Sequence, residues 1–225
     1  MPDIKALFKL STNDFIPILE NGLLRKQYVP VDLSIYNTDL NRFDITKTDE
    51  CQAYIDSVIG TTGKIAFGGY LEKRNLYNNN SKFDATDDNA RNIHLGVDFW
   101  APTNTKVLVP VEGVVHSFKN NTTLGDYGPT IILKHNLNGV IFYSLYGHLS
   151  IASLDKLFVG KQFSQGDTLA TLGAKDINVG YAPHLHFQII LDIDTYLGDY
   201  PGVTSSKDLD FYTNNCPDPN FLLKI

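Results

Sequence analysis

The sequence has few cysteines and no long apolar run, which argues against several common classes of protein. It has two cysteines, Cys51 and Cys216, and no Cys-x-x-Cys pair, which excludes a zinc knuckle built on paired thiols. The two cysteines lie far apart, so one disulfide is open as an alternative, but two separate thiols are the favoured interpretation. No apolar run approaches the ~18 residues needed to cross a bilayer, so we expect no membrane insertion.

Positive charge is also scarce. The chain has 19 Lys and Arg against 25 Asp and Glu, for a formal net charge of -6. Without a Lys/Arg cluster to neutralise phosphates, we expect no nucleic-acid partner. The first residues lack the basic and apolar regions of an export signal, which predicts a cytoplasmic protein, or an envelope or extracellular one if a signal was removed. Nothing in the sequence indicates an oligomeric state.

Residues that favour β-strands are abundant, with 12 Tyr and 13 Phe. From residue 92 onward, short apolar runs alternate with turn signals, and Asn138-Gly139 is a strong hairpin signal. The pattern predicts a mainly β fold, an antiparallel β-sandwich or barrel-like core. The expected strands are 106–111, 114–118, 130–135, 140–145 and 184–192, with further strands in the glycine-punctuated stretch 159–172.

The flanking regions have other patterns, and they predict three parts. Residues 1–63 form a small α+β extension packed on the core, with a helix over 14–26, an edge strand over 28–36 and a helix capped by Thr48 and followed by Gly60. Residues 64–198 form the β domain, which includes a polar loop at 78–91. Residues 199–225 wrap around it without much regular structure.

Two histidines stand one residue apart in the motif Pro-His-Leu-His-Phe at 183–187. Side chains alternate along a strand, so His184 and His186 project to the same side. Buried imidazoles need partners, and a metal ion with a catalytic water would supply them. For an isolated pair, hydrogen-bonded surface histidines are the more ordinary interpretation.

A second ligand pair shifts the balance towards a metal. His94 and Asp98 are four positions apart, an even spacing that puts them on one face of a strand, although Gly96 lets the chain bend between them. Together with His186 they offer two imidazoles and one carboxylate. Three protein ligands with an open position are typical of a catalytic zinc site.

These residues carry a family resemblance. His94-x-x-x-Asp98, Tyr-Gly-His-Leu at 146–149 and Pro-His-Leu-His-Phe at 183–187, in this order, resemble the lysostaphin-type (LytM-like) zinc metallopeptidases, which cut peptide cross-links of peptidoglycan. The similarity extends from about residue 92 to 190. The flanks at 69–74 and 199–203 further resemble a subgroup found beside kinase-like and aminotransferase modules.

The resemblance implies a role for each matching residue. His94, Asp98 and His186 would bind one Zn²⁺ per chain. His148 and His184 would be the catalytic pair that orients and deprotonates the nucleophilic water. A peptide or peptidoglycan would be the substrate.

Independently of the resemblance, Tyr70, Glu72 and Arg74 follow the pair Gly68-Gly69 and could line a substrate groove, with a glycine turn and a Glu72–Arg74 ion pair as an equally favoured alternative. Tyr146 and Tyr181 are further candidate substrate contacts.

Other interpretations of the same residues stay open. A non-haem iron oxygenase also uses two His and one carboxylate, but it leaves His148 and His184 without a role. The stretch 159–170 resembles lipoyl and biotinyl carriers but offers no exposed lysine at a hairpin tip. The missing export signal motivates a third alternative, a zinc hydrolase of a small cytoplasmic peptide or amide, or a non-catalytic scaffold. Gln188, where many family members have Glu, is a departure that we expect to leave activity intact.

Overall fold

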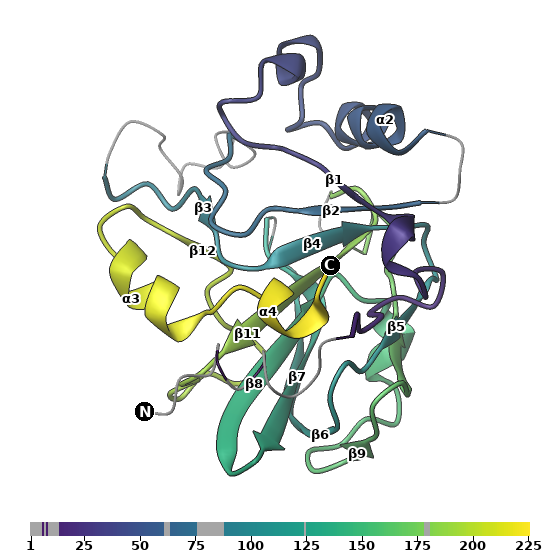
Figure 1. The fold of residues 1–225 in the computed structure, drawn as a ribbon, viewed down its shortest axis with the longest axis vertical. Coiled ribbons are helices and arrows are strands. Elements are labelled where there is room, and N and C mark those ends of the chain that lie inside the picture. Colours follow the sequence, from purple (N-terminus) through teal and green to yellow (C-terminus); the bar gives the residue numbers. More distant parts are fainter. Residues whose placement is uncertain are drawn as a thin grey trace.

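The computed structural model describes Ala6, Phe8 and residues 14–60, 64–75, 88–123, 125–177 and 181–225. Its main element is an eight-stranded sheet in the order β1-β2-β4-β11-β8-β7-β6-β9 (Figure 1). In that order the strands are Tyr28–Pro30, Ile65–Gly68, Val97–Trp100, His184–Ile190, Val140–Gly147, Gly128–Leu137, Gly113–Asn121 and Gln162–Phe163. Neighbouring strands pair antiparallel, except that β1 and β2 are parallel.

Two small sheets and a few helices complete the described part of the chain. β5 (Lys106–Leu108) pairs with β10 (Thr168–Thr171), and β3 (Ile93–His94) pairs with β12 (Val203–Thr204). The helices are α2 (Thr48–Ile59), α3 (Leu209–Asn215) and α4 (Asn220–Leu223), with 3₁₀ turns η1 (Arg25–Gln27), η2 (Thr38–Arg42) and η3 (Ile151–Leu154). Among the described residues, no helix is both long and apolar enough to span a membrane.

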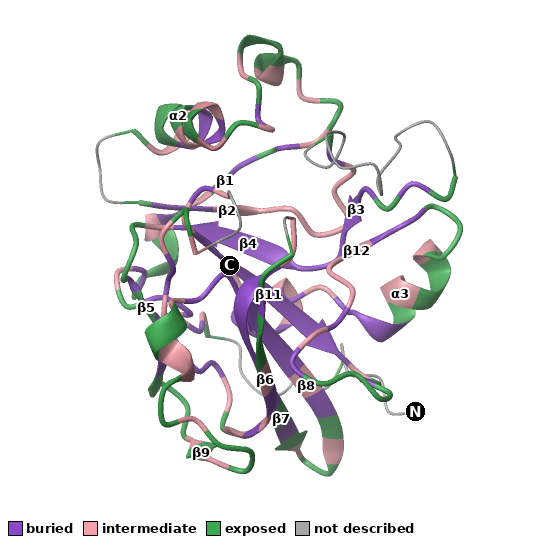
Figure 2. Cartoon of the chain, turned by 180° about the vertical axis from the view of Figure 1, so that it is seen from behind, coloured by how far each residue is buried: buried purple, intermediate pink, exposed green. Residues whose placement is uncertain are grey.

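The predicted mainly β architecture is confirmed, with open sheets instead of a closed barrel in the described part of the chain. The hairpin forms where expected, because Asn138 and Gly139 both have positive φ (52° and 84°), as a two-residue turn of the type I′ class requires. Strand β11 begins at His184 as predicted, and all seven of its residues are buried (Figure 2).

Strand β11 divides its side chains between two environments. Its odd-numbered residues Leu185, Phe187 and Ile189 belong to the main hydrophobic cluster. Residues from both ends of the chain complete this cluster, including Phe8, whose ring meets Phe142 edge to face, and Leu222 of α4. The even-numbered residues of β11 therefore face the opposite side, where the candidate site lies.

The helix expected over 14–26 is wrong. Pro17 interrupts this segment and cannot donate a helical hydrogen bond, so apolar spacing alone does not make a helix. The segment instead runs irregularly, with Ile18 and Leu19 fully buried and Leu19 bridged to Val107, and only η1 is helical. The edge strand at 28–36 is shorter than expected and ends at Pro30.

Two other expectations need adjustment. Helix α2 ends before Gly60 as predicted, but Thr48 is its first residue and Lys47 occupies the N-cap position. The C-terminal stretch includes α3 and α4, so it is more regular than expected.

Cys51 and Cys216 are buried free thiols, in agreement with the favoured interpretation. Of the expected polar loop at 78–91, residues 78–87 lie outside the described residues.

Candidate metal centre

Strand register brings two of the three candidate ligands together. Asp98 on β4 lies directly opposite His186 on β11, and His186 lies opposite Gly147 on β8. Directly opposed residues of antiparallel strands project on the same face, so Asp98 and His186 point to one side of the sheet. The residue that follows Gly147 is His148, so the end of β8 reaches the same place.

His94 arrives from a different strand. It ends β3, whereas Asp98 belongs to β4, so the expectation that both lie on one strand is wrong. The chain turns between them at Gly96, against the ring of His186, where a Cβ atom would lie 2.7 Å from Cε1 and Nε2 of that ring. A larger residue at 96 would collide with this ligand, and glycine leaves the room that His186 needs.

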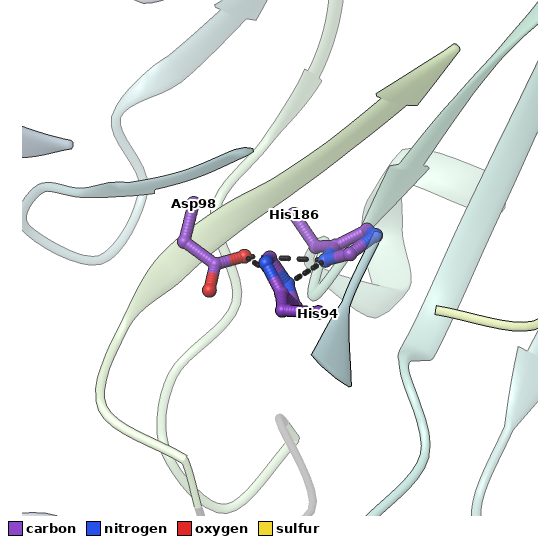
Figure 3. Close-up of side chains that lie close together, drawn as sticks. All are labelled: His94, Asp98 and His186. Atoms are coloured by element: carbon purple, nitrogen blue, oxygen red, sulfur yellow. Dashed lines mark hydrogen bonds and ion pairs between the residues drawn. The ribbon is translucent and has the colours of Figure 1, made fainter. Parts of the chain in front are cut away.

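The three side chains converge on one point (Figure 3). Nε2 of His94 lies 2.9 Å from Nδ1 of His186, and each nitrogen lies 3.2 Å from Oδ1 of Asp98. Ligands about 2.0–2.1 Å from a tetrahedral zinc ion would be separated by about 3.3 Å. The triangle therefore has nearly the edge lengths that one bound ion would impose.

The outer hydrogen bonds of both imidazoles decide which nitrogen carries the proton. Nδ1 of His94 lies 3.0 Å from the carbonyl of Gly69, which can only accept, so Nδ1 carries the hydrogen in the neutral ring. Nε2 of His186 lies 3.0 Å from Oε1 of Gln188, whose amide nitrogen is directed to the carbonyl of Pro201. His186 Nε2 is therefore the donor in that contact.

Consequently, with both imidazoles neutral, the inward-facing atoms of the three residues are all acceptors. Nε2 of His94, Nδ1 of His186 and Oδ1 of Asp98 direct lone pairs at one another in a site where each residue is at most 3% exposed. Such an arrangement is unfavourable unless a cation occupies the centre. The donor set, two neutral imidazoles and one carboxylate, fits Zn²⁺, with a position left for water.

His94 and Asp98 have the protonation states that metal ligands need near pH 7. Burial, and then the nearby Arg74, lower the pKa of His94 to about 4, so His94 is neutral near pH 7. Burial alone would raise the pKa of Asp98, but His94 and Arg74 outweigh it and hold that pKa well below its usual value. Asp98 is therefore an anion and can bind a cation.

A second pair of histidines lies beside this centre. The rings of His148 and His184 have centroids 4.1 Å apart. Nδ1 of His184 donates to the carbonyl of Ala182 (2.7 Å), which leaves Nε2 as an acceptor 3.9 Å from Oδ1 of Asp98. Nδ1 of His148 is buried and has no hydrogen-bond partner among the described residues. Burial lowers the pKa of both rings, so both are neutral and able to accept a proton.

The centre opens into a cleft of about 360 Å³. His148 and His184 line it together with the three candidate ligands, and Tyr181 lies near both histidines, with ring centroids 5.4 and 6.0 Å away. The N-terminal extension supplies Leu33 and Cys51 to the wall of this cleft, so it contributes to the shape of the cleft.

The candidate substrate contacts are only partly in position. Tyr181 and Arg74 line the cleft, but Arg74 is 3% exposed and its guanidinium binds Asp98. Tyr70 donates to the carbonyl of Cys216, and Glu72 pairs with Arg74 and accepts from the amide of Leu33. Tyr146 is fully buried against Phe187 in the main cluster, which corrects the expectation that it contacts substrate.

The remaining two histidines, His116 and His135, make contacts outside the metal centre. His135 is buried, with Nδ1 2.8 Å from the carbonyl of Glu112 and Nε2 2.6 Å from Oγ of Ser144. His116 contacts its neighbour Ser117 through Nδ1 at 2.9 Å and packs edge to face on Tyr143.

Sequence reasoning did not single out Tyr127 as a site residue. Its ring lies 5.0 Å from that of His186 and 5.9 Å from that of His148, and it lines the cleft. Gly147 and Gly202 make room for it, because a Cβ at either position would collide with the tyrosine ring or hydroxyl. The only sequence signal for Tyr127 is its place next to Gly128 within the stretch that carries the resemblance.

Comparisons with known proteins agree with this geometry. The family model of peptidase family M23 matches residues 92–196, the segment that contains all three candidate ligands and both further histidines. A protein from Haemophilus influenzae named as an uncharacterized metalloprotease is 34% identical over 95 residues, which cover 42% of this chain and 18% of the relative. The peptidoglycan DD-endopeptidase ShyA of Vibrio cholerae is 31% identical over 98 residues, or 44% of this chain and 20% of ShyA.

The chain therefore spans about a fifth of the length of these two relatives. Among solved structures, the catalytic domain of the antimicrobial peptidase lysostaphin from Staphylococcus simulans is similar, with 22% identity and a TM-score of 0.36. That similarity covers 54% of this chain and 80% of the lysostaphin domain.

Proposed function

Since residues 92–196 belong to peptidase family M23, we propose that this chain is a zinc-dependent endopeptidase that hydrolyses peptide bonds in peptidoglycan cross-links or related short peptides. The observation that carries the proposal is the convergence of three buried lone pairs, from His94, Asp98 and His186, next to two neutral histidines in an open cleft. A cation-binding triad with a proton acceptor beside it is the minimum that metal-assisted hydrolysis needs.

The three ligands would hold one Zn²⁺ through Nε2 of His94, Oδ1 of Asp98 and Nδ1 of His186. Zinc bound in such a site acidifies a water molecule and polarises a carbonyl oxygen. Since the ligand set has one negative charge, the occupied centre keeps a net positive charge, which favours both effects.

His148 and His184 would handle the proton. Nε2 of His184 carries a lone pair and faces the ligands, while Nδ1 of His184 stays bound to the carbonyl of Ala182, which fixes the ring. His148 lines the cleft, and its buried Nδ1 has no hydrogen-bond partner among the described residues, so it is available to accept or donate a hydrogen bond. One ring can take the proton of the attacking water while the other stabilises the oxyanion.

The substrate would lie in the cleft, which Tyr127, Tyr181 and Tyr200 line. Tyr181 is the half-buried one of these tyrosines, and its ring would pack on the apolar parts of a peptide. The name of ShyA, a peptidoglycan DD-endopeptidase, supports cross-link peptides as the substrate class. Action on peptidoglycan would take place at the cell envelope.

A direct test is to incubate the zinc-loaded protein with purified muropeptides and, separately, with oligoglycine, and to identify the products by mass spectrometry. We expect new termini from internal peptide bonds, and their loss after chelation and return on adding Zn²⁺. Protein carrying Asp98→Ala serves as the matched control. If neither substrate is cleaved by a protein that has bound zinc, the small-substrate or scaffold alternative replaces this one.

A further inference from the structure

A short segment outside the part that matches the family lies against the metal centre. Residues 69–74 follow β2 and run alongside β3. Main-chain hydrogen bonds join them, from Leu71 to the carbonyl of His94, from His94 to the carbonyl of Glu72 and from Arg74 to the carbonyl of Asn92. Their lengths are 2.9, 3.0 and 2.9 Å, so the segment is held to the strand that carries a candidate ligand.

Arg74 lies between two carboxylates. Its Nη1 lies 2.6 Å from Oδ2 of Asp98, and its Nε lies 2.5 Å from Oε2 of Glu72. The arginine is 3% exposed, so both contacts are made away from solvent. A planar guanidinium fixes the orientation of a carboxylate that it binds. Asp98 is therefore held with Oδ2 on the arginine and Oδ1 towards His94 and His186.

Gly69 allows this packing. Its φ of +106° is unfavourable for other residues, and a Cβ there would lie 2.0 Å from Nη2 of Arg74 and 2.9 Å from Nδ1 of His94. Its carbonyl accepts from His94. The same segment thus contacts two of the three candidate ligands, one through the Gly69 backbone and one through the Arg74 side chain.

We propose that Arg74 is a positioning residue of the metal centre, which occupies Oδ2 of Asp98 so that the carboxylate binds the metal through Oδ1 alone. Glu72 acts as the counter-charge that makes a buried arginine tolerable next to a metal cation. This inference rests on the proposed metal site. It adds that residues 69–74, outside the segment that matches the family, belong to the working centre.

When Arg74 occupies Oδ2, Asp98 supplies one oxygen atom to the metal ion and not two. Without the guanidinium, both oxygens of Asp98 are free to approach the ion, as carboxylates often do with larger coordination numbers. A second oxygen would fill the position that water needs in a catalytic site. Loss of an outer partner also weakens metal binding, typically by about 10–100-fold.

The test uses the full chain and the metal itself. Arg74→Met combined with Glu72→Gln removes one positive and one negative charge together, so the net charge near the metal does not change. Zinc affinity is measured by competition with a chromophoric chelator, and the visible spectrum of the Co²⁺-substituted protein reports the ligand number. Circular dichroism verifies folding, and Arg74→Lys, which retains the charge but not the fork geometry, is examined in parallel.

We expect the double variant to bind zinc about 10–100-fold more weakly than wild type and its Co²⁺ absorption to weaken, since a further oxygen joins the ion. Arg74→Lys should give a smaller change in the same direction. Arg91→Met is the matched control: it removes a guanidinium from the same cleft, one that donates to the carbonyl of Val203, and should leave both readouts unchanged.

The possible results separate the two proposals. If wild type binds no metal, the proposed function fails. If wild type binds one ion and the folded double variant or Arg74→Lys gives the wild-type affinity and Co²⁺ spectrum, Arg74 has only a structural role and this inference is overturned. If the double variant does not fold, Arg74→Lys alone decides between these outcomes.

Discussion

Oε1 of Gln188 lies 3.0 Å from Nε2 of His186, on the side of the imidazole that faces away from Asp98 and His94. The amide nitrogen of Gln188 is bound to the carbonyl of Pro201 (3.1 Å) and to Sγ of Cys216 (3.3 Å). Both ends of the glutamine amide are thus engaged, and the C-terminal stretch fixes the ring orientation of a candidate metal ligand through it.

Replacing Gln188 by leucine should therefore weaken zinc binding. The variant loses the acceptor that keeps the hydrogen on Nε2 of His186, and we expect a fall in zinc affinity of about 10–100-fold, measured by competition with a chelator. Gln188→Glu restores an acceptor at the same place and should recover most of the affinity. Gln52→Leu, on the exposed side of α2, is the matched control. Equal zinc affinities for Gln188→Leu and wild type would show that Gln188 does not support metal binding through His186.

Asp98→Ala should abolish stoichiometric zinc binding. It removes one of three ligands and one of the two carboxylates that Arg74 binds, so the site loses a negative charge next to a buried guanidinium and becomes less favourable for a cation. Metal content is measured by atomic absorption after dialysis against a weak chelator. Asp199→Ala changes another aspartate of the cleft, one that pairs with Lys119, and should retain one zinc ion. Full zinc occupancy in Asp98→Ala would refute the ligand assignment.

His148→Ala should keep the metal and lose hydrolysis. His148 lies outside the ligand triad but within ring contact of His184, so its removal takes away a proton acceptor without touching the ion. We expect a loss in kcat of about 10²–10⁴-fold at unchanged zinc content. The assay is the muropeptide or oligoglycine cleavage described above. Turnover at the wild-type rate would exclude His148 from the mechanism.

Stability should fall between pH 6.5 and about 4 partly because of His135. Burial lowers the pKa of this histidine from 6.5 to about 4. In that interval the unfolded chain binds a proton that the folded chain does not, so stability is full above pH 6.5 and declines as pH falls. The contribution of this one group is about 3 kcal/mol at most.

The measurement is urea unfolding of the metal-free protein at a series of pH values. Other buried histidines titrate in the same range, so the comparison is between wild type and His135→Gln, which lacks this one group. The variant will be less stable at pH 7, because its contacts with Glu112 and Ser144 change. Its free energy of unfolding should nevertheless decline less steeply with falling pH. Parallel curves would contradict the assignment.

Much of the site follows from local sequence. Alternation along a strand puts His184 and His186 on one side of β11, and the burial of its apolar residues Leu185, Phe187, Ile189 and Ile190 follows from their hydrophobic character. The Asn138-Gly139 turn follows from its two residues. These features depend on neighbours in the chain, and they are predictable for that reason.

Features that depend on distant segments were not predictable. Apolar spacing over 14–26 suggested a helix. Pro17 within the segment already disfavours one, and the bridge from Leu19 to the distant Val107 holds the segment in an irregular conformation. Tyr70, Glu72 and Arg74 were expected either to line a substrate groove or to form a glycine turn with a Glu72–Arg74 ion pair, and the ion pair is present. The contact of Arg74 with Asp98 was not expected, because it depends on the pairing of residues 71–74 with β3.

The sequence by itself determined which residues are candidate metal ligands, because His94, Asp98 and His186 stand in recognisable motifs with suitable donor atoms. Only the tertiary structure decided that they meet, since this needs the register of β4 against β11 and the turn at Gly96 between two strands. It also decided which atom of each ligand faces the centre. That choice depends on Gly69, Gln188 and Arg74, partners that strand pairing and packing bring in from other parts of the chain.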